Sequence, residues 1–269
     1  MGVVNVTPDS FSDGGAFDDP AQAVEHGRRL VSEGADVLDI GGESTRPGAE
    51  PVPAAVEIER VLPVVEGLVG VQRVSIDTMK AEVAAAAVAA GASYVNDVSA
   101  FRHDPDMAGM VADFGLDCCL MHMLGEPRTM QREPRYVDVV SEVKAFLTER
   151  MTAAIDAGVR EEGIQLDPGI GFGKTLEHNL ELLRRLHELT DLGRPLVIGT
   201  SRKSFLGRLT GRDVTERVHG TVATCVMALE RGARVFRVHD VAAVADALKV
   251  ASATVGEWPT SPTTTTTTS

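Results

Sequence analysis

One pattern repeats eight times along this chain, and it limits the possible folds more than any other feature. Each repeat is a short apolar run that ends in a polar residue, followed by a loop with Gly or Pro and then by a segment with helical periodicity. The runs are continuously apolar, which is typical of strands buried on both faces of a sheet. We expect these strands at Gly2–Val6, Val37–Gly42, Val74–Asp77, Tyr94–Val98, Asp117–His122, Ile164–Asp167, Leu196–Gly199 and Val235–His239.

The segments between the runs carry helix signals. Apolar residues at a spacing of three or four form a single helical stripe at Val140, Val143, Leu147, Met151 and Ile155. Glycine follows several of these segments, where a helix commonly ends in a left-handed residue. Eight strand–helix units in one chain predict an α/β fold, a single (β/α)8 TIM barrel that spans residues 1–257. An open doubly wound sheet is the alternative, but it usually has fewer strands and a reversal of strand order, and the sequence carries no marker of one.

Composition removes several classes of protein. The net charge of −13, from 39 acidic and 26 basic residues, argues against nucleic acid as a partner. No apolar stretch approaches the ~18 residues that a membrane span needs. The three cysteines lack metal-ligand spacing and stand in apolar surroundings, which favours a reducing compartment. The N-terminus has no basic region of a signal peptide, so we expect a cytoplasmic protein. Residues 258–269, with a run of threonines, are expected to form a disordered low-complexity tail.

Polar side chains gather where the predicted strands end. In a (β/α)8 barrel the active site lies at the carboxyl ends of the strands, so these residues are candidates for function. A scaffold needs few of them, because each costs free energy to bury without a partner. They are Asn5, Glu43, Ser44, Thr45, Arg46, Asp77, Asn96, Asp97, His122, Asp167, Ser201, Arg202, Lys203, Ser204, Arg237, His239 and Asp240.

The first chemical group among them is Asp77, Asn96, Asp167 and Lys203. An ionised aspartate only accepts hydrogen bonds and a lysine only donates them. Such a set suits a flat heterocycle like an aminopyrimidinone, whose amino group and ring N–H donate while its carbonyl accepts. A structural role is the alternative, because Asp77 and Asp167 could each cap the next turn. Asp167 also stands in an Asp-Pro-Gly turn sequence.

The second group is Arg46, Arg237 and His239, with Asn5 and Thr45. Residues two apart on a strand point to the same face, so Arg237 and His239 should face the same way. Arginine binds phosphate through two parallel hydrogen bonds. A diphosphate with a divalent cation would fit, and the amide oxygen of Asn5 is a suitable ligand for such a cation. The alternative is that Arg237 pairs with a neighbouring carboxylate.

The stretch Gly169–Thr175 looks like a phosphate-binding P-loop but lacks a required glycine. That motif needs Gly five positions before its last Gly, and Pro168 stands there. Proline also removes a backbone N–H that would contact phosphate. The sequence therefore argues against a P-loop NTPase.

Seven stretches, in order along nearly the whole chain, resemble motifs of the dihydropteroate synthase family. Each stretch alone is weak evidence for the family. Seven stretches in the same order, with the spacing of barrel units, are highly specific evidence. They are Gly2–Gly15, Asp39–Gly48, Ser75–Thr78, Asn96–Val98, Asp167–Phe172, Ser201–Lys203 and Arg237–His239.

The resemblance implies a role for individual residues. The pterin would be bound by Asp77, Asn96, Val98, Met121, Asp167, Phe172, Gly199 and Lys203. The pyrophosphate would be bound by Asn5, Thr45, Arg46, Arg237 and His239, with Mg²⁺ at Asn5. The p-aminobenzoate site would be formed by Phe11, Pro47, Phe172, Lys203 and Ser204. The residues expected to carry catalysis are Asp77, Lys203, Arg237 and Asp13, the last from a loop that closes over the metal and pyrophosphate.

The resemblance also implies a reaction. The pyrophosphate of 6-hydroxymethyl-7,8-dihydropterin would condense with p-aminobenzoate to give 7,8-dihydropteroate and pyrophosphate, a step of folate biosynthesis. The family precedent is a homodimer through outer helices. Relatives that resist sulfonamides carry an insertion near the Gly-Phe-Gly loop, and residues 169–175 show none, so we expect sulfonamide inhibition. Family members usually have a segment before the first motif, and without one we expect the base of the barrel to close differently.

Two other functions fit part of this pattern. A methyltransferase barrel that passes a methyl group from a reduced folate to a corrinoid would share the pterin-binding carboxylates. It would not need the cationic motifs at 201–203 and 237–239. A non-catalytic pterin-binding module is the second alternative.

Overall fold

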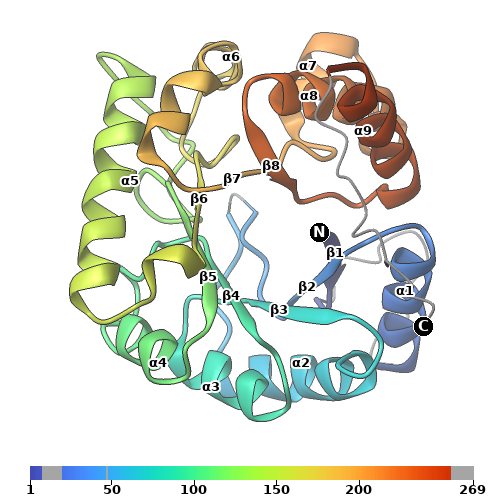
Figure 1. Ribbon diagram of the computed structural model, residues 1–269, viewed down its shortest axis with the longest axis vertical. Coiled ribbons are helices and arrows are strands. Elements are labelled where there is room, and N and C mark those ends of the chain that lie inside the picture. The colour runs from blue at the N-terminus through green and yellow to red at the C-terminus, as the bar shows by residue number, and fades with distance from the viewer. Residues whose placement is uncertain (8–19, 47, 256–269) are drawn as a thin grey trace, which may run out of the picture.

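The chain forms a closed barrel of eight parallel strands that lie in sequence order around one axis (Figure 1). The computed structural model describes residues 1–7, 20–46 and 48–255. The predicted (β/α)8 barrel is confirmed, whereas the predicted threonine-rich tail lies outside the described residues. The strands are β1 Gly2–Asn5, β2 Val37–Gly41, β3 Arg73–Asp77, β4 Tyr94–Asp97, β5 Asp117–Met121, β6 Ile164–Asp167, β7 Leu196–Ile198 and β8 Ala233–Phe236.

Helices follow the strands and form the outer layer. They are α1 Pro20–Ser32, α2 Ala54–Leu68, α3 Ala81–Ala89, α4 Met107–Asp113, α5 Val139–Asp156, α6 Leu176–Arg184, α7 Ser204–Thr210, α8 Val218–Glu230 and α9 Val241–Val255. Three short 3-10 helices join them, at η1 Glu161–Gly163, η2 Leu186–Leu192 and η3 Val214–Glu216. None of the helices in the described part of the chain is long and apolar enough to cross a bilayer.

The predicted strand boundaries agree with the structure to within about one residue, except for the last strand. The regular part of β8 ends at Phe236, three residues before the predicted end at His239. The pairing of β7 with β8 is irregular, because the register shifts between Leu196 and Val197. The extended chain nevertheless continues, because the N–H of Arg237 donates to the carbonyl of Ile198 at 2.9 Å.

The barrel closes between its first and last strands. Val238 pairs with Gly2 in a parallel bridge, and its N–H donates to the carbonyl of Met1 at 3.0 Å. The amino group of Met1 donates to the carbonyl of Phe236 at 3.0 Å. Met1 also packs against a small cluster inside the barrel that contains the buried side chains of Tyr94, Cys119 and Val197. The first residue of this sequence thus helps to fill the barrel interior.

Successive strand residues face opposite sides, and the two sides are chemically different. Residues such as Leu38, Ile40, Val74 and Ile76 are fully or almost fully buried in the large core between strands and helices. The alternate positions point into the barrel and include polar side chains, among them Asp39, whose carboxylate accepts from Ser75 at 2.6 Å. This alternation follows from the two-residue period of a strand. This alternation points the polar residues at the strand ends into the interior of the barrel.

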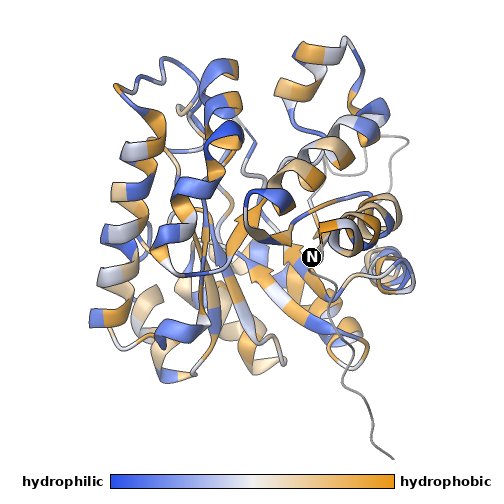
Figure 2. Cartoon of the chain, turned by 45° about the horizontal axis from the view of Figure 1, so that its top comes forward, coloured by the Kyte–Doolittle hydropathy of each residue, from blue (hydrophilic) through white to orange (hydrophobic). Residues whose placement is uncertain are grey.

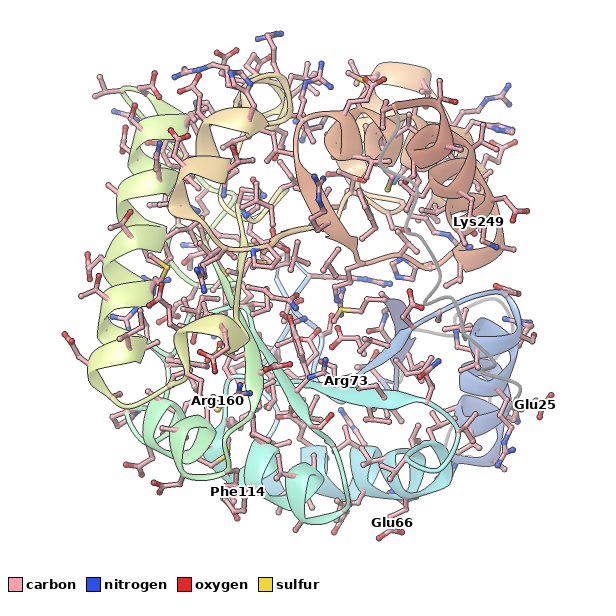
Figure 3. The ribbon with its side chains drawn as sticks, viewed as in Figure 1. Glu25, Glu66, Arg73, Phe114, Arg160 and Lys249 are labelled. Carbon is pink, nitrogen blue, oxygen red and sulfur yellow. The ribbon has the colours of Figure 1, made fainter. Side chains whose placement is uncertain are left out.

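The helices turn their apolar faces to the sheet and their charged faces outward (Figure 2). In α5 the predicted stripe is confirmed: Val140, Val143 and Leu147 are buried, and Met151 and Ile155 pack against the same core. The exposed charges lie on the opposite faces, as Glu25 on α1, Glu66 on α2 and Lys249 on α9 show (Figure 3). Burial of the apolar stripes stabilises the outer layer by about 25 cal/mol per Å².

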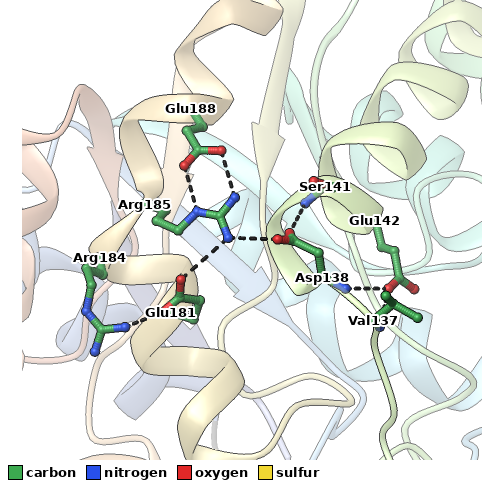
Figure 4. Close-up of polar contacts among 8 residues, drawn as sticks. All are labelled: Val137, Asp138, Ser141, Glu142, Glu181, Arg184, Arg185 and Glu188. Atoms are coloured by element: carbon green, nitrogen blue, oxygen red, sulfur yellow. Dashed lines mark hydrogen bonds and ion pairs between the residues drawn. The ribbon is translucent and has the colours of Figure 1, made fainter.

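An ion network ties α5 to α6 and η2 (Figure 4). The guanidinium of Arg185 binds both carboxylate oxygens of Glu188, at 2.6 and 2.9 Å, and reaches Asp138 at 2.9 Å. Asp138 also caps α5 by accepting from the N–H of Ser141 at 2.8 Å. Because the network is partly exposed and its charges are screened by solvent, it orients the helices more than it stabilises the fold.

The loop after β6 passes close to the end of β5. Gly169 has φ +67°, and a Cβ there would lie 1.8 Å from the carbonyl oxygen of His122. The N–H of His122 in turn donates to the carbonyl of Asp167 at 2.9 Å. Only glycine therefore fits at position 169, where a left-handed backbone and a close approach coincide.

This close approach predicts the effect of adding one methyl group. Gly169→Ala should lower the free energy of unfolding by about 3 kcal/mol, because left-handed strain and a steric clash add. Gly193 is the matched control, since it has φ +70° and its surroundings leave open space within 4 Å of where a Cβ would stand. Gly193→Ala should cost only about 1 kcal/mol, from strain alone. Urea unfolding of both variants measures the difference, and equal losses would contradict the prediction.

Candidate active site

A single hollow opens at the carboxyl ends of the strands. Every described residue to which the family resemblance gave a substrate contact lines it, including Asp77, Asn96, Asp167, Lys203 and Arg237. The others are Asn5, Thr45, Arg46, Val98, Met121, Phe172, Gly199, Ser204 and His239. Phe11, Asp13 and Pro47 lie outside the described residues. The geometry thus brings the predicted residues together, while the substrate atoms that each would contact stay a prediction.

Arg237 joins the two predicted chemical groups. Its Nε donates to Asp39 at 2.5 Å, and its Nη2 donates to Asp77 at 2.6 Å. The alternative raised from the sequence, pairing of Arg237 with a neighbouring carboxylate, is therefore what the structure shows. Such a pairing is compatible with ligand binding, because Nη1 has no hydrogen-bond partner among the described residues and a guanidinium offers five donors.

Asp39 is a residue that the strand-end argument missed. It lies in the middle of β2, is 0% exposed, and accepts from Ser75 at 2.6 Å and from Asn96 at 3.1 Å in addition to Arg237. A buried carboxylate persists only when it is paired and hydrogen-bonded. The sequence signal was a lone acidic residue inside an otherwise apolar strand. Asp39 orients Arg237 and Asn96 from below the hollow.

Burial controls the ionisation of Asp77. It raises the pKa of this carboxyl group to about 7 against the opposing charge of Arg237, and the negative charge of Asp39 acts in the same direction as burial. A carboxylate beside an arginine would ordinarily stay ionised well below neutrality. Desolvation outweighs the arginine here, so Asp77 changes charge near neutral pH. A pKa near the working pH is common for groups in active sites.

Asp167 and Lys203 face each other across Gly199. A Cβ on Gly199 would lie 3.9 Å from Oδ2 of Asp167 and 3.6 Å from Nζ of Lys203. Burial raises the pKa of Asp167 and lowers the pKa of Lys203 to about 8, although each charge favours the other. Asp167 also accepts from the N–H of Gly169 at 2.6 Å, which confirms part of the turn-capping alternative. The pair offers an acceptor and a donor on one side of the hollow.

Apolar side chains form one wall of the hollow. Met79, Val98, Met121, Met123 and Met130 make a buried cluster that is separate from the main core. Phe172 packs against this cluster, and the ammonium of Lys203 lies 4.6 Å from the centre of its ring. Flexible methionines and an aromatic ring make a suitable wall for a flat ligand.

The opposite side of the hollow carries Asn5, Thr45, Arg46 and His239. Burial, together with the charges of Arg237 and Arg202, lowers the pKa of His239 to about 3. His239 is therefore uncharged at neutral pH and serves as a hydrogen-bonding group, whereas its place beside Arg237 in the sequence had suggested a cation. Its Nδ1 lies 3.0 Å from the hydroxyl of Ser201, which fixes the ring.

Asn5 is the predicted magnesium ligand. Its side chain makes no hydrogen bond to another described residue, and it lines the hollow beside Thr45 and Arg46. No group of three or more acidic, cysteine or histidine residues in the described part of the chain could hold a metal alone. Mg²⁺ often binds through one or two protein oxygens together with substrate phosphates and water. The donor set therefore fits a cation that arrives with a diphosphate.

Two strand-end residues serve the scaffold instead. Asp97 accepts from the N–H groups of Ser99 at 2.7 Å and Phe101 at 3.0 Å, so it caps the turn after β4. His122 lies 2.8 Å from the ammonium nitrogen of the buried Lys174, which also donates to the carbonyl of Phe172 at 3.0 Å. Lys174, part of the stretch that looked like a P-loop, thus supports the loop that carries Phe172.

Comparison with known proteins gives the family. A model described as pterin binding enzyme matches residues 1–239. The dihydropteroate synthase of Neisseria meningitidis serogroup B is 49% identical over 259 residues, which cover 93% of this chain and 90% of that protein. This chain belongs to the dihydropteroate synthase family.

Solved structures of dihydropteroate synthases have the same fold. The enzyme of Xanthomonas albilineans with 4-aminobenzoic acid superposes with a TM-score of 0.89 at 52% identity, over 95% of this chain and 92% of that one. The enzyme of Yersinia pestis with a sulfonamide drug superposes with a TM-score of 0.91 at 43% identity, over 95% and 94%. These relatives share one named activity, so family membership favours condensation over the methyltransferase alternative.

The raised pKa of Asp77 predicts how pterin binding depends on pH. If the ionised carboxylate accepts the N–H groups of a pterin edge, as expected from the sequence, affinity for 6-hydroxymethyl-7,8-dihydropterin should decrease as pH falls below about 7. Asp77→Asn should bind more weakly and show a smaller dependence on pH, because its amide does not titrate while Asp167 and Lys203 remain. Calorimetric titrations between about pH 5.5 and 7.5 measure this. A wild-type affinity that is constant across this range would contradict the assignment.

Proposed function

We propose that this chain condenses 6-hydroxymethyl-7,8-dihydropterin pyrophosphate with p-aminobenzoate to give 7,8-dihydropteroate and pyrophosphate. The observation that carries the proposal is the hollow itself. One side presents Asp77, Asn96, Asp167 and Lys203, and Arg237 joins that side to the diphosphate side. Family membership supports the reaction type, and the pattern of donors and acceptors supports the substrate.

The polar edge of the pterin would form hydrogen bonds with complementary groups of the protein. Asp77 and Asp167 accept from the amino and ring N–H groups, Asn96 donates and accepts, and Lys203 donates to the carbonyl. Val98, Met121 and Phe172 would cover the ring, and Gly199 leaves room for it between Asp167 and Lys203. Because these groups are held by strands, little reorganisation is needed on binding.

The diphosphate would leave with its bonding electrons as the bond between the pterin methylene carbon and the phosphate oxygen breaks. The negative charge that develops is stabilised by Arg237 and Arg46, with hydrogen bonds from His239 and Thr45. Mg²⁺ held by the amide oxygen of Asn5 would supply further positive charge to the diphosphate. Asp77 lies on the other side, where the positive charge of the pterin develops. This route needs no protein nucleophile.

The amine of p-aminobenzoate would then attack the methylene carbon, form the C–N bond and lose a proton. Lys203, Phe172 and Ser204 border the part of the hollow that this second substrate would enter, and Phe11 and Pro47 are proposed to complete it. Asp13 is proposed to close over the diphosphate and keep water from the cation. The Xanthomonas albilineans relative, solved with 4-aminobenzoic acid, supports this assignment.

The proposal also includes the location and the oligomeric state of the protein. We propose a cytoplasmic homodimer that forms through the outer helices α8 and α9. Met227 on α8 and Val250 on α9 are exposed by 43% and 68%, and such a dimer would cover them.

A turnover assay tests the proposed function. The protein is mixed with the pterin pyrophosphate, p-aminobenzoate and Mg²⁺, and released pyrophosphate and dihydropteroate are measured. Asp77→Asn should lower kcat by about 100-fold or more, while pterin binding weakens less, because its charge matters most in the transition state. Asp117→Asn is the control, since Asp117 pairs with Arg73 and Arg160 at the opposite end of the barrel.

The outcomes of this assay are distinct. Wild-type protein that binds pterin but releases no pyrophosphate would indicate a non-catalytic module. Near-normal kcat in Asp77→Asn would refute the role of this carboxylate even if the wild type is active. The Asp117→Asn control should keep full activity, which separates a general loss of charge from a loss at the site.

Sulfonamides should compete with p-aminobenzoate in this chain. The loop at 169–175 has no insertion, and Phe172, Lys203 and Ser204 border a continuous hollow. The Yersinia pestis relative was solved with a sulfonamide drug. Sulfamethoxazole should raise the apparent KM for p-aminobenzoate and leave kcat unchanged. Turnover that is unaffected by millimolar drug at low p-aminobenzoate would contradict this expectation.

A further inference from the structure

A buried ion network lies beside the proposed site and none of its members belongs to the proposed substrate contacts. The ammonium of Lys80, just after β3, donates to the carboxylate of Glu57 at 2.5 Å and also to the carboxylate of Glu43. Glu57 on α2 is 0% exposed, and the side chains of Lys80 and Glu43 are exposed by only 16% and 11%. Three charges are thus removed from water, which is costly unless they hold one another in place.

The network secures the loop that follows β2. Glu43 begins this loop, and its carboxylate also accepts from the N–H of Val52 near the other end of the loop at 3.1 Å. Arg60 on α2 donates to the carbonyl of Gly42 at 2.9 Å. The loop is therefore attached at both ends, and Thr45 and Arg46, two of the proposed diphosphate ligands, lie between these attachments.

A small cavity of ≈ 10 Å³ is lined by residues of both the network and the site. Its lining includes Glu43, Glu57 and Lys80 together with Thr45 and Asp77. Oε1 of Glu57 is buried and has no hydrogen-bond partner among the described residues, whereas Oε2 accepts from Lys80. The network therefore borders both the diphosphate loop and the central carboxylate.

We propose that Lys80 is a positioning residue, which holds Glu43 against Glu57 and thereby fixes Thr45 and Arg46 for the diphosphate of the substrate. The proposal rests on the proposed function of the hollow. A misplacement of about 1 Å in a ligand-binding group can cost a large part of the rate, so a loop of this kind gains from being held rigidly. The expected effect of losing the network is selective: the diphosphate is bound less well, and the pterin ring is not.

Glu43→Ala is the sharpest test. It removes the contacts of this carboxylate with Lys80 and Val52 and leaves Lys80 and Glu57 as a neutral pair, so the fold is retained. Binding of the pterin pyrophosphate with Mg²⁺ should weaken about tenfold, whereas binding of the same pterin without its diphosphate should change less than about twofold. Lys80→Arg should keep much of the affinity, because it retains the positive charge and can donate to both carboxylates.

Arg73→Met is the matched control. Arg73 stands at the start of β3, four strand residues before Asp77, and binds Asp117 at 2.5 Å. This variant removes an ion pair from the same strand at the opposite end of the barrel, and it should leave both affinities unchanged.

The results separate this inference from the proposed function. An inactive wild type would overturn the proposed function. An active wild type whose Glu43→Ala variant binds the pterin pyrophosphate normally would overturn the positioning role alone. Equal weakening of both ligands in Glu43→Ala would also overturn it, because that result indicates a general loss of structure.

Discussion

The guanidinium of Arg237 is the interaction on which the rest of the site depends. It belongs to the strand that closes the barrel, and it binds Asp39 and Asp77 on β2 and β3, far away in sequence. Two buried carboxylates in one barrel would repel each other strongly without a cation between them. Closure of the barrel supplies that cation, so the same contact that completes the fold also assembles the side chains around the hollow.

Burial then adjusts the charges in a way that suits displacement of a diphosphate. It raises the pKa of Asp77 to about 7 and lowers the pKa of Lys203 to about 8, so both groups are near their titration points at neutral pH. It also keeps His239 uncharged at neutral pH. Fixed charges and dipoles of this kind stabilise developing charge without the reorganisation that water would require. The methionine wall and Phe172 complete the low-dielectric surroundings that make these charges effective.

Much of this arrangement could be predicted from the sequence, because it depends on the repeat of apolar runs and on which residues follow each run. Apolar runs indicated all eight strands, and the rule that barrel sites lie at carboxyl strand ends selected the residues that line the hollow. Long-range partners could not be predicted: the pairing of Arg237 with Asp39, and of Lys80 with Glu43 and Glu57, joins segments whose relative placement depends on the closed barrel. The neutral state of His239 was also missed, because burial and neighbouring arginines determine it and neither is visible in a motif. The end of β8 was predicted three residues too late for a similar reason, because its irregular register with β7 depends on tertiary structure.

A crystal structure with the pterin pyrophosphate and Mg²⁺ bound tests the central claim most directly. The account predicts the pterin ring among Asp77, Asn96, Asp167 and Lys203, and a diphosphate oxygen on Nη1 of Arg237 while Nε of that arginine stays on Asp39. A ligand bound outside this hollow, or an Arg237 that turns away from both the diphosphate and Asp39, would contradict it.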